Sequence, residues 1–469
     1  MTFDHTGAVS PPPGCPAHQG GTRRVTPMHG SDFAANPTAV YEGLRREGPV
    51  AAVELAPGVS AALVTSYSTA LRVMRDPGVF AKDPRRWRAL SQGRVPRDSP
   101  VLPLMAYRPT CMFSDGDDHR RLRAVVDDSL SRIDPNRLRE EVESSADALI
   151  DAFAPYGTAD LLADYASPLI FHVISSMFGC PPDLADRLLA ALTEIFNAGS
   201  AADQADVDAA QCFAELVALK RAQPGADMTS WMIAHPAQLN DLELIHQIAI
   251  LYGAGTEPGG NLIANSLRLL LADDRFSGSL SGGTLPIGDA LDEVLWKDPP
   301  MANFSVHYPV HDVLLDGVWL RAGDPVVISL AASNNDPALQ SQDRNGNRAH
   351  LAWGAGPHSC PAQPSARLIA EVAIERLLDR LPDLDLAIPA DHLTWRPGPF
   401  HRSLQALPVV FPPEDASARQ PRAAGGEAIG PDVTAAPPML TSGTPEREEP
   451  AGPTRLGRFW QVVASRGAR

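Results

Sequence analysis

The feature that most constrains this 469-residue chain is a glycine-rich loop that ends in a cysteine. Residues 353–362 read Trp-Gly-Ala-Gly-Pro-His-Ser-Cys-Pro-Ala. Gly354 and Gly356 can adopt backbone angles closed to other residues, and they allow a flat ligand to approach the main chain. Pro361 suits the first position of a helix, and a helical pattern follows at once. The loop therefore presents the sulfur of Cys360 at its end.

The pattern after the loop predicts a helix that begins next to this sulfur. Ile369, Val372 and Leu377 recur at helical spacing. Cys360 would then lie beside the positive, N-terminal end of the helix dipole, where a thiolate is favoured and can ligate iron. The alternative is a buried free cysteine in a glycine-rich turn. The loop alone leaves both interpretations open.

The loop resembles the haem-binding loop of the cytochrome P450 family, usually Phe-x-x-Gly-x-x-x-Cys-x-Gly with a histidine two residues before the cysteine. Gly356, His358 and Cys360 match this form. Trp353 stands for the phenylalanine, and Ala362 stands for the last glycine. The resemblance implies that Cys360 is the axial ligand of the iron in haem b (iron protoporphyrin IX) and that the whole loop binds this cofactor.

An acidic turn at residues 115–118 leads into a helical pattern with two side chains that can bind an anion. His119 and Arg123 lie four residues apart, hence on one helical face, where they can grip a carboxylate together or simply face solvent. The family has a His-x-x-x-Arg pair here that binds the haem propionates, and the resemblance assigns them this role. By position His307 replaces a third propionate-binding arginine, and His358 completes the predicted set.

The longest helical pattern runs from Leu242 to Asp273, with Ala-Gly-Thr-Glu-Pro at residues 254–258 in its middle. Small residues allow a ligand to lie against a helix. Pro258 removes an amide donor and collides with the carbonyl of Ala254, so we expect a kink. The segment resembles the oxygen-binding stretch of the family's central helix, usually Ala/Gly-Gly-x-Asp/Glu-Thr. Pro258 occupies the place of the threonine.

This proline changes the expected chemistry. The family threonine donates a hydroxyl hydrogen bond at the oxygen site and helps protons reach it, whereas proline has nothing to donate. Protons must then come from Glu257, Thr256, ordered water or the substrate, and the sequence does not choose among them. The predicted catalytic residues are therefore Glu257, Thr256 and Ala254. For Glu257 the alternative is a carboxylate that is merely paired within a helix.

A second departure concerns the family's Glu-x-x-Arg motif, whose charged hydrogen bonds pin the loop before the cysteine. Residues 293–296 read Glu-Val-Leu-Trp, and tryptophan brings one N–H and no charge. We therefore hypothesise that Arg344 or Arg348 contacts Glu293 while Trp296 fills the vacated volume. The chain is similar to a minority of actinobacterial family members with such an altered motif.

The resemblance covers about residues 36–411 and implies a mainly α fold with small β-sheets (α+β), in which a long central helix lies over the haem. We predict a flexible lead at 1–31, a haem domain at 32–411 and a disordered linker at 412–453, because nine prolines among alanine, glycine and glutamate cannot build a core. Residues 454–469 form either a short basic amphipathic helix that docks a partner or a membrane surface, or a frayed tail.

Within the predicted haem domain, residues 83–113 are rich in arginine and proline with weak periodicity, so we expect mostly loop. The resemblance implies that this loop caps the substrate pocket, and the alternative is a plain surface loop. Residues 395–411 are similar to the family's last sheet, which dips a turn into that pocket.

Composition narrows the partners and the compartment. A formal net charge of −16 disfavours nucleic acid. No run of about 18 apolar residues and no apolar stretch of signal-peptide type occur, so we expect a cytoplasmic protein without an integral membrane anchor. Five widely spaced cysteines without Cys-x-x-Cys argue against a disulfide framework or a zinc cluster. His172 and His246 lack a second ligand at metal spacing and are expected to be surface or core histidines.

Together these features imply a haem-thiolate monooxygenase that inserts one oxygen atom from O2 into a small organic molecule. Electrons would come from a ferredoxin-type partner, with Arg120 and Arg121 in its docking patch. Because Pro258 and Trp296 alter parts tied to dioxygen activation, peroxide-dependent or non-oxidative chemistry is one alternative. The other is a non-catalytic, haem-bearing interaction protein that recruits partners through its tail.

Overall fold

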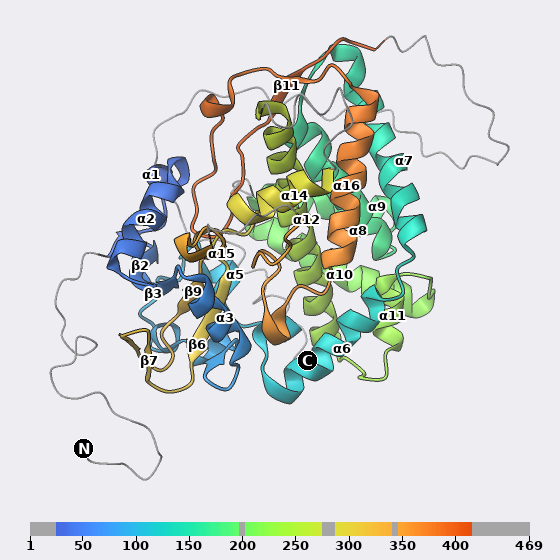
Figure 1. The fold of residues 1–469 in the computed structure, drawn as a ribbon. Helices are drawn as coiled ribbons and strands as arrows, with labels where there is room; N and C mark the ends of the chain where they lie inside the picture. The colour runs from blue at the N-terminus through green and yellow to red at the C-terminus, as the bar shows by residue number, and fades with distance from the viewer. Residues whose placement is uncertain (1–24, 197–201, 274–286, 340–345, 415–469) are drawn as a thin grey trace, which may run out of the picture.

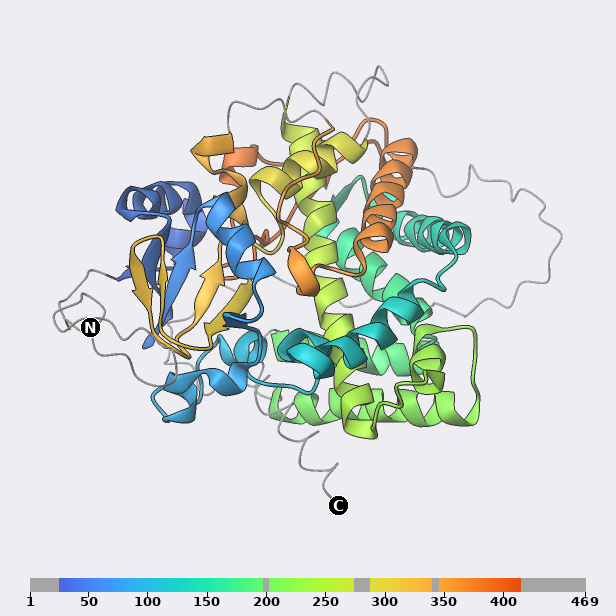
Figure 2. The same ribbon diagram turned by 60° about the horizontal axis from the view of Figure 1, so that its bottom comes forward.

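The computed structural model describes residues 25–196, 202–273, 287–339 and 346–414. A large helical part stands beside a smaller part that carries the main sheet (Figure 1, Figure 2). This arrangement confirms the predicted mainly α fold with small β-sheets. The predicted terminal helix at 454–469 lies outside the described residues, as does all of the predicted linker except residues 412–414.

The N-terminal lead is described from residue 25 onward. In this part, strand β1 (Thr26–Pro27) pairs in parallel with β2 (Val50–Ala56), and helix α1 (Ser31–Ala35) begins at Ser31. The folded part of the chain therefore starts before residue 32.

The helical part surrounds one long central helix, α12, which is capped at its start. The side chain of Asn240 accepts a hydrogen bond from the backbone N–H of Glu243, and the carboxylate of Glu243 accepts one from the backbone N–H of Asn240, which satisfies two orphan amides. The helices of the helical part are α6 (Gly116–Leu130), α7 (Pro135–Phe153), α8 (Ser167–Met177), α9 (Pro182–Phe196), α10 (Ala202–Ala222), α11 (Met228–Ala234), α12 (Asp241–Ala272), α14 (Ile287–Lys297) and α16 (Gln363–Arg380).

Helix α12 continues through Pro258 without interruption. Its glycines serve two different purposes. A Cβ atom on Gly255 would lie 2.6 Å from the side chain of Ile174 in α8, and one on Gly259 would lie 3.0 Å from Ile170 in the same helix. These two glycines therefore allow close packing of α8 on α12. A Cβ on Gly253 meets nothing within 4 Å, so that face of α12 has room for a ligand.

In the described residues the main sheet has six strands in the order β1-β2-β3-β9-β6-β4, and β2 and β3 form an antiparallel hairpin. Its other strands are β3 (Val59–Val64), β4 (Phe80–Ala81), β6 (Ser305–Pro309) and β9 (Val326–Ile328). The smaller sheets are β10-β11-β5, with β10 (Asp385–Leu386), β11 (Pro408–Val410) and β5 (Thr158–Asp160), and β7-β8, with β7 (Val313–Leu315) and β8 (Val318–Leu320).

Short helices complete the part around the sheet. They are α2 (Pro37–Glu47), α3 (Tyr67–Arg75), α4 (Arg88–Ser91), α5 (Leu102–Met105) and α15 (Leu330–Asn334). Residues 83–113 contain only α4, α5 and two single 3₁₀ turns, which agrees with the expected loop. Among the described residues, no helix has the length and apolar character needed to cross a membrane.

Candidate active site at the cysteine loop

The cysteine loop has the conformation that its glycines predict. Gly354 and Gly356 have φ angles of 70° and 71°, in the left-handed region that favours glycine. A Cβ atom on Gly356 would lie 2.3 Å from the carbonyl oxygen of Met74 in α3. The N–H of Cys360 donates a hydrogen bond to the carbonyl of Trp353 at 2.7 Å, which closes the loop. The loop is therefore shaped by its backbone and by close contact with α3.

The sulfur of Cys360 lies at the start of α16, as predicted. Burial raises the pKa of the Cys360 thiol, while the backbone N–H groups of Ala362 and Gln363, together with the charge of Arg123, act in the opposite direction. The net shift is upward. A buried thiolate here thus needs a further positive partner, and a bound metal ion deprotonates a coordinating thiol outright. The surroundings of Cys360 therefore suit a sulfur bound to iron better than a free thiolate.

Several basic side chains gather next to this loop. The rings of His119 in α6 and His358 in the loop lie with centroids 4.0 Å apart. Burial lowers the pKa of His358 strongly, and the nearby charges of Lys82, His119, His307 and Arg123 lower it further. Arg123 also donates to the carbonyls of Pro357 and Ser359, the two neighbours of His358 in the loop. The structure therefore brings the predicted propionate set His119, His307, His358 and Arg123 together.

Lys82 is the member of this group that the sequence did not reveal. It follows β4, whose antiparallel pairing with β6 places Ala81 opposite Tyr308, so the next residue pair in register is Lys82 and His307. Only 7% of Lys82 is exposed, and burial lowers the pKa of its ammonium group to about 8 although Asp115 opposes this shift. No local motif marks this lysine, because only strand pairing brings it to the site.

Most of these basic groups contact no carboxylate in the described part of the chain, although the charge of Asp115 acts on Lys82 and His119. The Nε2 atom of His119 is buried without a hydrogen-bond partner, and Lys82 forms no ion pair there. Arg123 is the exception, because its Nε donates to Asp127 at 2.7 Å and its Nη1 donates to the loop carbonyls of Pro357 and Ser359. One buried ammonium group and three imidazoles that can donate N–H hydrogen bonds while neutral fit a ligand that carries carboxylates, such as the two haem propionates.

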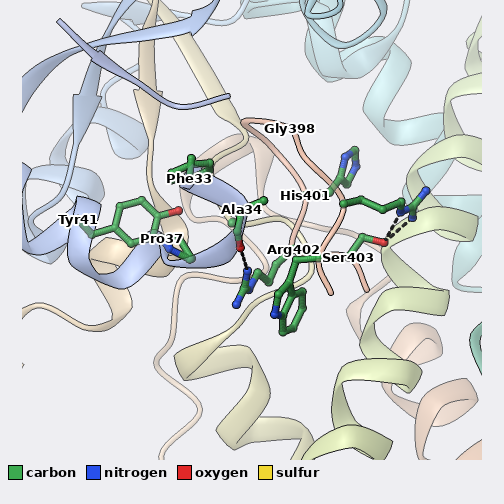
Figure 3. Close-up of a pocket in the computed structure, with 11 residues that line it drawn as sticks. Phe33, Ala34, Pro37, Tyr41, Gly398, His401, Arg402 and Ser403 are labelled. Carbon is green, nitrogen blue, oxygen red and sulfur yellow. Dashed lines mark hydrogen bonds between the residues drawn. The ribbon is translucent and has the colours of Figure 1, made fainter. Parts of the chain in front are cut away.

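The polar groups on α12 are held by a distant segment. Glu257 forms an ion pair with Arg396 at 2.7 Å, and 18% of its side chain is exposed. Arg396 Nε also donates to the hydroxyl of Ser403, which is labelled in Figure 3, at 2.8 Å. That hydroxyl donates to Oδ1 of Asn261 at 2.7 Å. The carboxylate of Glu257 is therefore tied to the segment that contains Arg396 and Ser403 rather than to its own helix.

The other two predicted catalytic residues differ from Glu257. The hydroxyl of Thr256 donates to the carbonyl of Tyr252 at 2.7 Å, so its proton is already used within α12. Ala254 is exposed although α12 runs through the middle of the molecule (Figure 1), so it lines open space like Gly253. Thr256 is a poor proton donor in this state, and Ala254 contributes room rather than chemistry.

The hypothesis about Arg348 and Glu293 needs a correction. Arg348 donates to Asp292 at 3.1 Å, and Glu293 forms an ion pair with Lys297 one turn further along α14 at 2.5 Å. Consecutive helical residues point about 100° apart, so the two acidic neighbours face different surroundings. Arg344 lies outside the described residues.

Trp296 takes the expected place in the core. It is buried at 4% exposure, and its indole N–H donates to the carbonyl of Asn347 at 2.7 Å.

The two histidines that the sequence left without a role differ in burial: His172 is exposed and His246 is buried. The described residues contain no group of three His, Cys, Asp or Glu side chains that could hold a metal ion, so neither histidine belongs to such a group.

Comparisons with known proteins give the class of this protein. No family model matches the chain. It is 34% identical over 393 residues to the cytochrome P450 monooxygenase PikC from Streptomyces venezuelae, which covers 81% of this chain and 92% of PikC. A 2-hydroxy-5-methyl-1-naphthoate 7-hydroxylase from Streptomyces carzinostaticus is 29% identical over 382 residues, covering 78% of this chain and 93% of that protein. These relatives fit the expected similarity to actinobacterial proteins.

The solved structures agree. CYP154C4 from Streptomyces sp. W2061 superposes with a TM-score of 0.74 at 29% identity, covering 82% of this chain and 97% of that structure. The chain therefore belongs to the cytochrome P450 family. It is a haem-thiolate monooxygenase, an oxidoreductase that incorporates molecular oxygen, and its cofactor is haem b.

Proposed function

We propose that Cys360 is the iron ligand and that Lys82, His119, His307 and His358 hold the haem carboxylates. The observation that carries this assignment is the buried ammonium group of Lys82 together with three imidazoles, of which the Nε2 atom of His119 has no hydrogen-bond partner in the described residues, beside a sulfur at a helix start. When bound, haem b supplies the oxidising iron centre, and thiolate ligation favours O–O cleavage. Arg123 fixes the loop through the carbonyls of Pro357 and Ser359.

Glu257 is the proposed proton-handling group on the oxygen side. Pro258 offers no donor, and the hydroxyl proton of Thr256 is bonded within the helix. Arg396 holds the carboxylate of Glu257 in one orientation, and His401, whose pKa burial lowers, lies close enough for its charge to interact with that of Glu257. This arrangement supplies an acid–base side chain where the family threonine is missing.

The proposed substrate is a mainly apolar ring compound with few polar substituents. A relative acts on a methylated hydroxynaphthoate, which is such a molecule. The exposed face of α12 at Gly253 and Ala254 supports the same class, because it offers open space lined by small apolar residues.

The experiment that tests this function compares turnover of a methylnaphthoate, driven by O2 with a ferredoxin and its reductase, with turnover driven by hydrogen peroxide. A linear dicarboxylate of similar size serves as the polar control. We expect oxygenated naphthoate with the reductase system and none from the control. Turnover with peroxide alone would favour the alternative that Pro258 suggests, a peroxide-dependent enzyme.

The proposed electron donor is an acidic ferredoxin that docks beside the cysteine loop. Arg120 and Arg121 already pair with Asp117 and Glu243, which weakens the expected patch. Arg75 is a stronger docking residue, because it is exposed and its Cα lies 3.3 Å from a Cβ built on Gly356. In the described part of the chain it has no ion-pair partner. The variant R75E should slow reduction by ferredoxin severalfold and leave reduction by dithionite unchanged.

A further inference from the structure

A single buried carboxylate in α14 contacts three basic side chains. Asp292 has 7% of its side chain exposed. Arg348 Nε donates to one carboxylate oxygen at 3.1 Å, and Arg367 Nη1 donates to the other. His350 Nε2 lies 3.9 Å from the oxygen that Arg367 contacts. This group of four residues is called the Asp292 cluster below.

The basic members of the Asp292 cluster come from both sides of Cys360. Arg348 and His350 precede the cysteine loop, and Arg367 follows it in the first turns of α16. The loop between them carries the sulfur. One carboxylate therefore connects the entry and the exit of the loop to the same helix.

Two further contacts tie the entry segment to α14. The indole N–H of Trp296 donates to the carbonyl of Asn347 at 2.7 Å. The side chain of Asn334 accepts from the N–H of Leu351 at 2.7 Å and donates to the carbonyl of Leu295 at 2.9 Å. Residues 347–351 are thus fastened to α14 along their length.

The carboxylate of Asp292 stays charged in this setting. Burial raises its pKa, but His350, Arg367 and Arg348 outweigh that effect, and the net pKa lies below the usual range. A charged acceptor makes its hydrogen bonds shorter and stronger than a neutral one does. Replacing the carboxylate by an amide would leave the buried guanidinium of Arg367 with Glu371, at 3.2 Å, as its remaining counter-ion.

We propose that Asp292 is a positioning residue that sets the place of the Cys360 sulfur by clamping both ends of its loop to α14. The inference rests on the proposed ligation of iron by Cys360. In this chain the clamp is built on Asp292, together with Trp296, at the place where the family motif would supply an arginine. Asp292 acts through the loop and does not touch the cofactor.

A control carboxylate pairs with arginines of the same helix, α16. Asp147 in α7 also receives two guanidinium groups, those of Arg376 at 2.7 Å and Arg380 at 2.9 Å. These arginines lie in the second half of α16, away from the cysteine loop. The variant D147N makes the same chemical change as D292N at a carboxylate that is 34% rather than 7% exposed, so it reports the effect of losing a carboxylate–arginine pair away from the cysteine loop.

The test measures the absorption spectrum of the reduced, carbon-monoxide-bound protein, together with thermal unfolding, for wild type, D292N and D147N. We expect D292N to lose most of the red-shifted band of a thiolate-bound iron in protein that is still folded and holds haem. D147N should lower the unfolding temperature and keep the band. A D292N protein with the wild-type band would overturn the proposal.

A further variant keeps the test decisive. If D292N does not fold, R348M removes one basic partner of Asp292 instead. Because Arg348 is 60% exposed, the protein should remain folded, and part of the thiolate band should be lost. An unchanged band in folded R348M would then count against the clamp. Failure of the underlying assignment looks different, because wild type itself would lack the thiolate band.

Discussion

The two sides of the proposed haem site are built in opposite ways. On the cysteine side, the sulfur is positioned by the loop backbone, by two amides at the start of α16 and by the Asp292 cluster. On the oxygen side, one carboxylate on α12 is held by one arginine from a segment 139 residues away. The first side has several independent supports and the second has few, so changes should affect the two sides differently.

Both sides depart from the family pattern, and the departures have different outcomes. Trp296 removes a guanidinium group from the cysteine side, where the neighbouring Asp292 gathers Arg348, Arg367 and His350. Pro258 removes a hydroxyl from the oxygen side, where no hydroxyl takes its place among the contacts described above. Structural support can be relocated to a neighbouring residue, whereas a proton donor must sit at the reacting atoms.

The largest effect is expected for a methyl group on the cysteine side. In G356A the new Cβ would lie 2.3 Å from the Met74 carbonyl, so the loop must shift and haem should be lost. Gly93 is the control, because it also has a positive φ, 67°, but a Cβ there meets nothing within 4 Å. G93A should cost only about 1–2 kcal/mol of backbone strain and keep its haem. Haem content and unfolding temperature are measured for G356A and G93A. Equal haem retention in the two variants would contradict the account.

A smaller but still large effect is expected on the oxygen side. E257Q removes the proposed proton-handling group, and general acid–base groups contribute at least about 10²-fold to rates. We expect turnover with O2 and ferredoxin to fall by about 10²-fold with an unchanged carbon-monoxide spectrum. E215Q, on the surface of α10 and paired with Arg187, is the control. Unchanged turnover in E257Q would show that protons come from water or substrate.

Lys82 tests the cofactor contacts with a moderate effect. A hydrogen bond to a charged group is worth about 1.5–3 kcal/mol, so K82M should raise the haem dissociation constant roughly 10- to 100-fold. The loss should disappear with haem dimethyl ester, which lacks the carboxylates. K297M is the control, because Lys297 is half-exposed on α14 and pairs with Glu293. An equal loss with both haems would show that Lys82 supports the fold rather than a carboxylate.

The smallest effect concerns pH and lies away from both sides. Burial raises the pKa of Asp147, but Arg376 and Arg380 outweigh it, so its folded pKa lies below its usual value of 3.8. The unfolded chain then binds the proton more readily, and this stabilisation is present above pH 3.8 and lost as pH falls through the folded pKa. Wild type and D147N should converge in unfolding temperature on acidification. A constant difference between them would contradict this assignment.

The cysteine side could be predicted from the sequence because its signals are local. The loop glycines, Cys360 and the helix after it lie within one short stretch, and His119 and Arg123 share one helical turn. The residues that were missed come from tertiary contacts. Lys82 reaches His307 through strand pairing, and Arg396 reaches Glu257 across the fold. The choice of Asp292 over Glu293 depends on which face of α14 meets α16, which sequence spacing alone did not resolve.

The most direct measurement is the absorption spectrum of the reduced, carbon-monoxide-bound protein, recorded for the wild type and for C360S after supplementation with haem. The account predicts the red-shifted band of a thiolate-ligated iron in the wild type and its absence in C360S. Identical bands in the two proteins, or a wild type that takes up no haem, would contradict it.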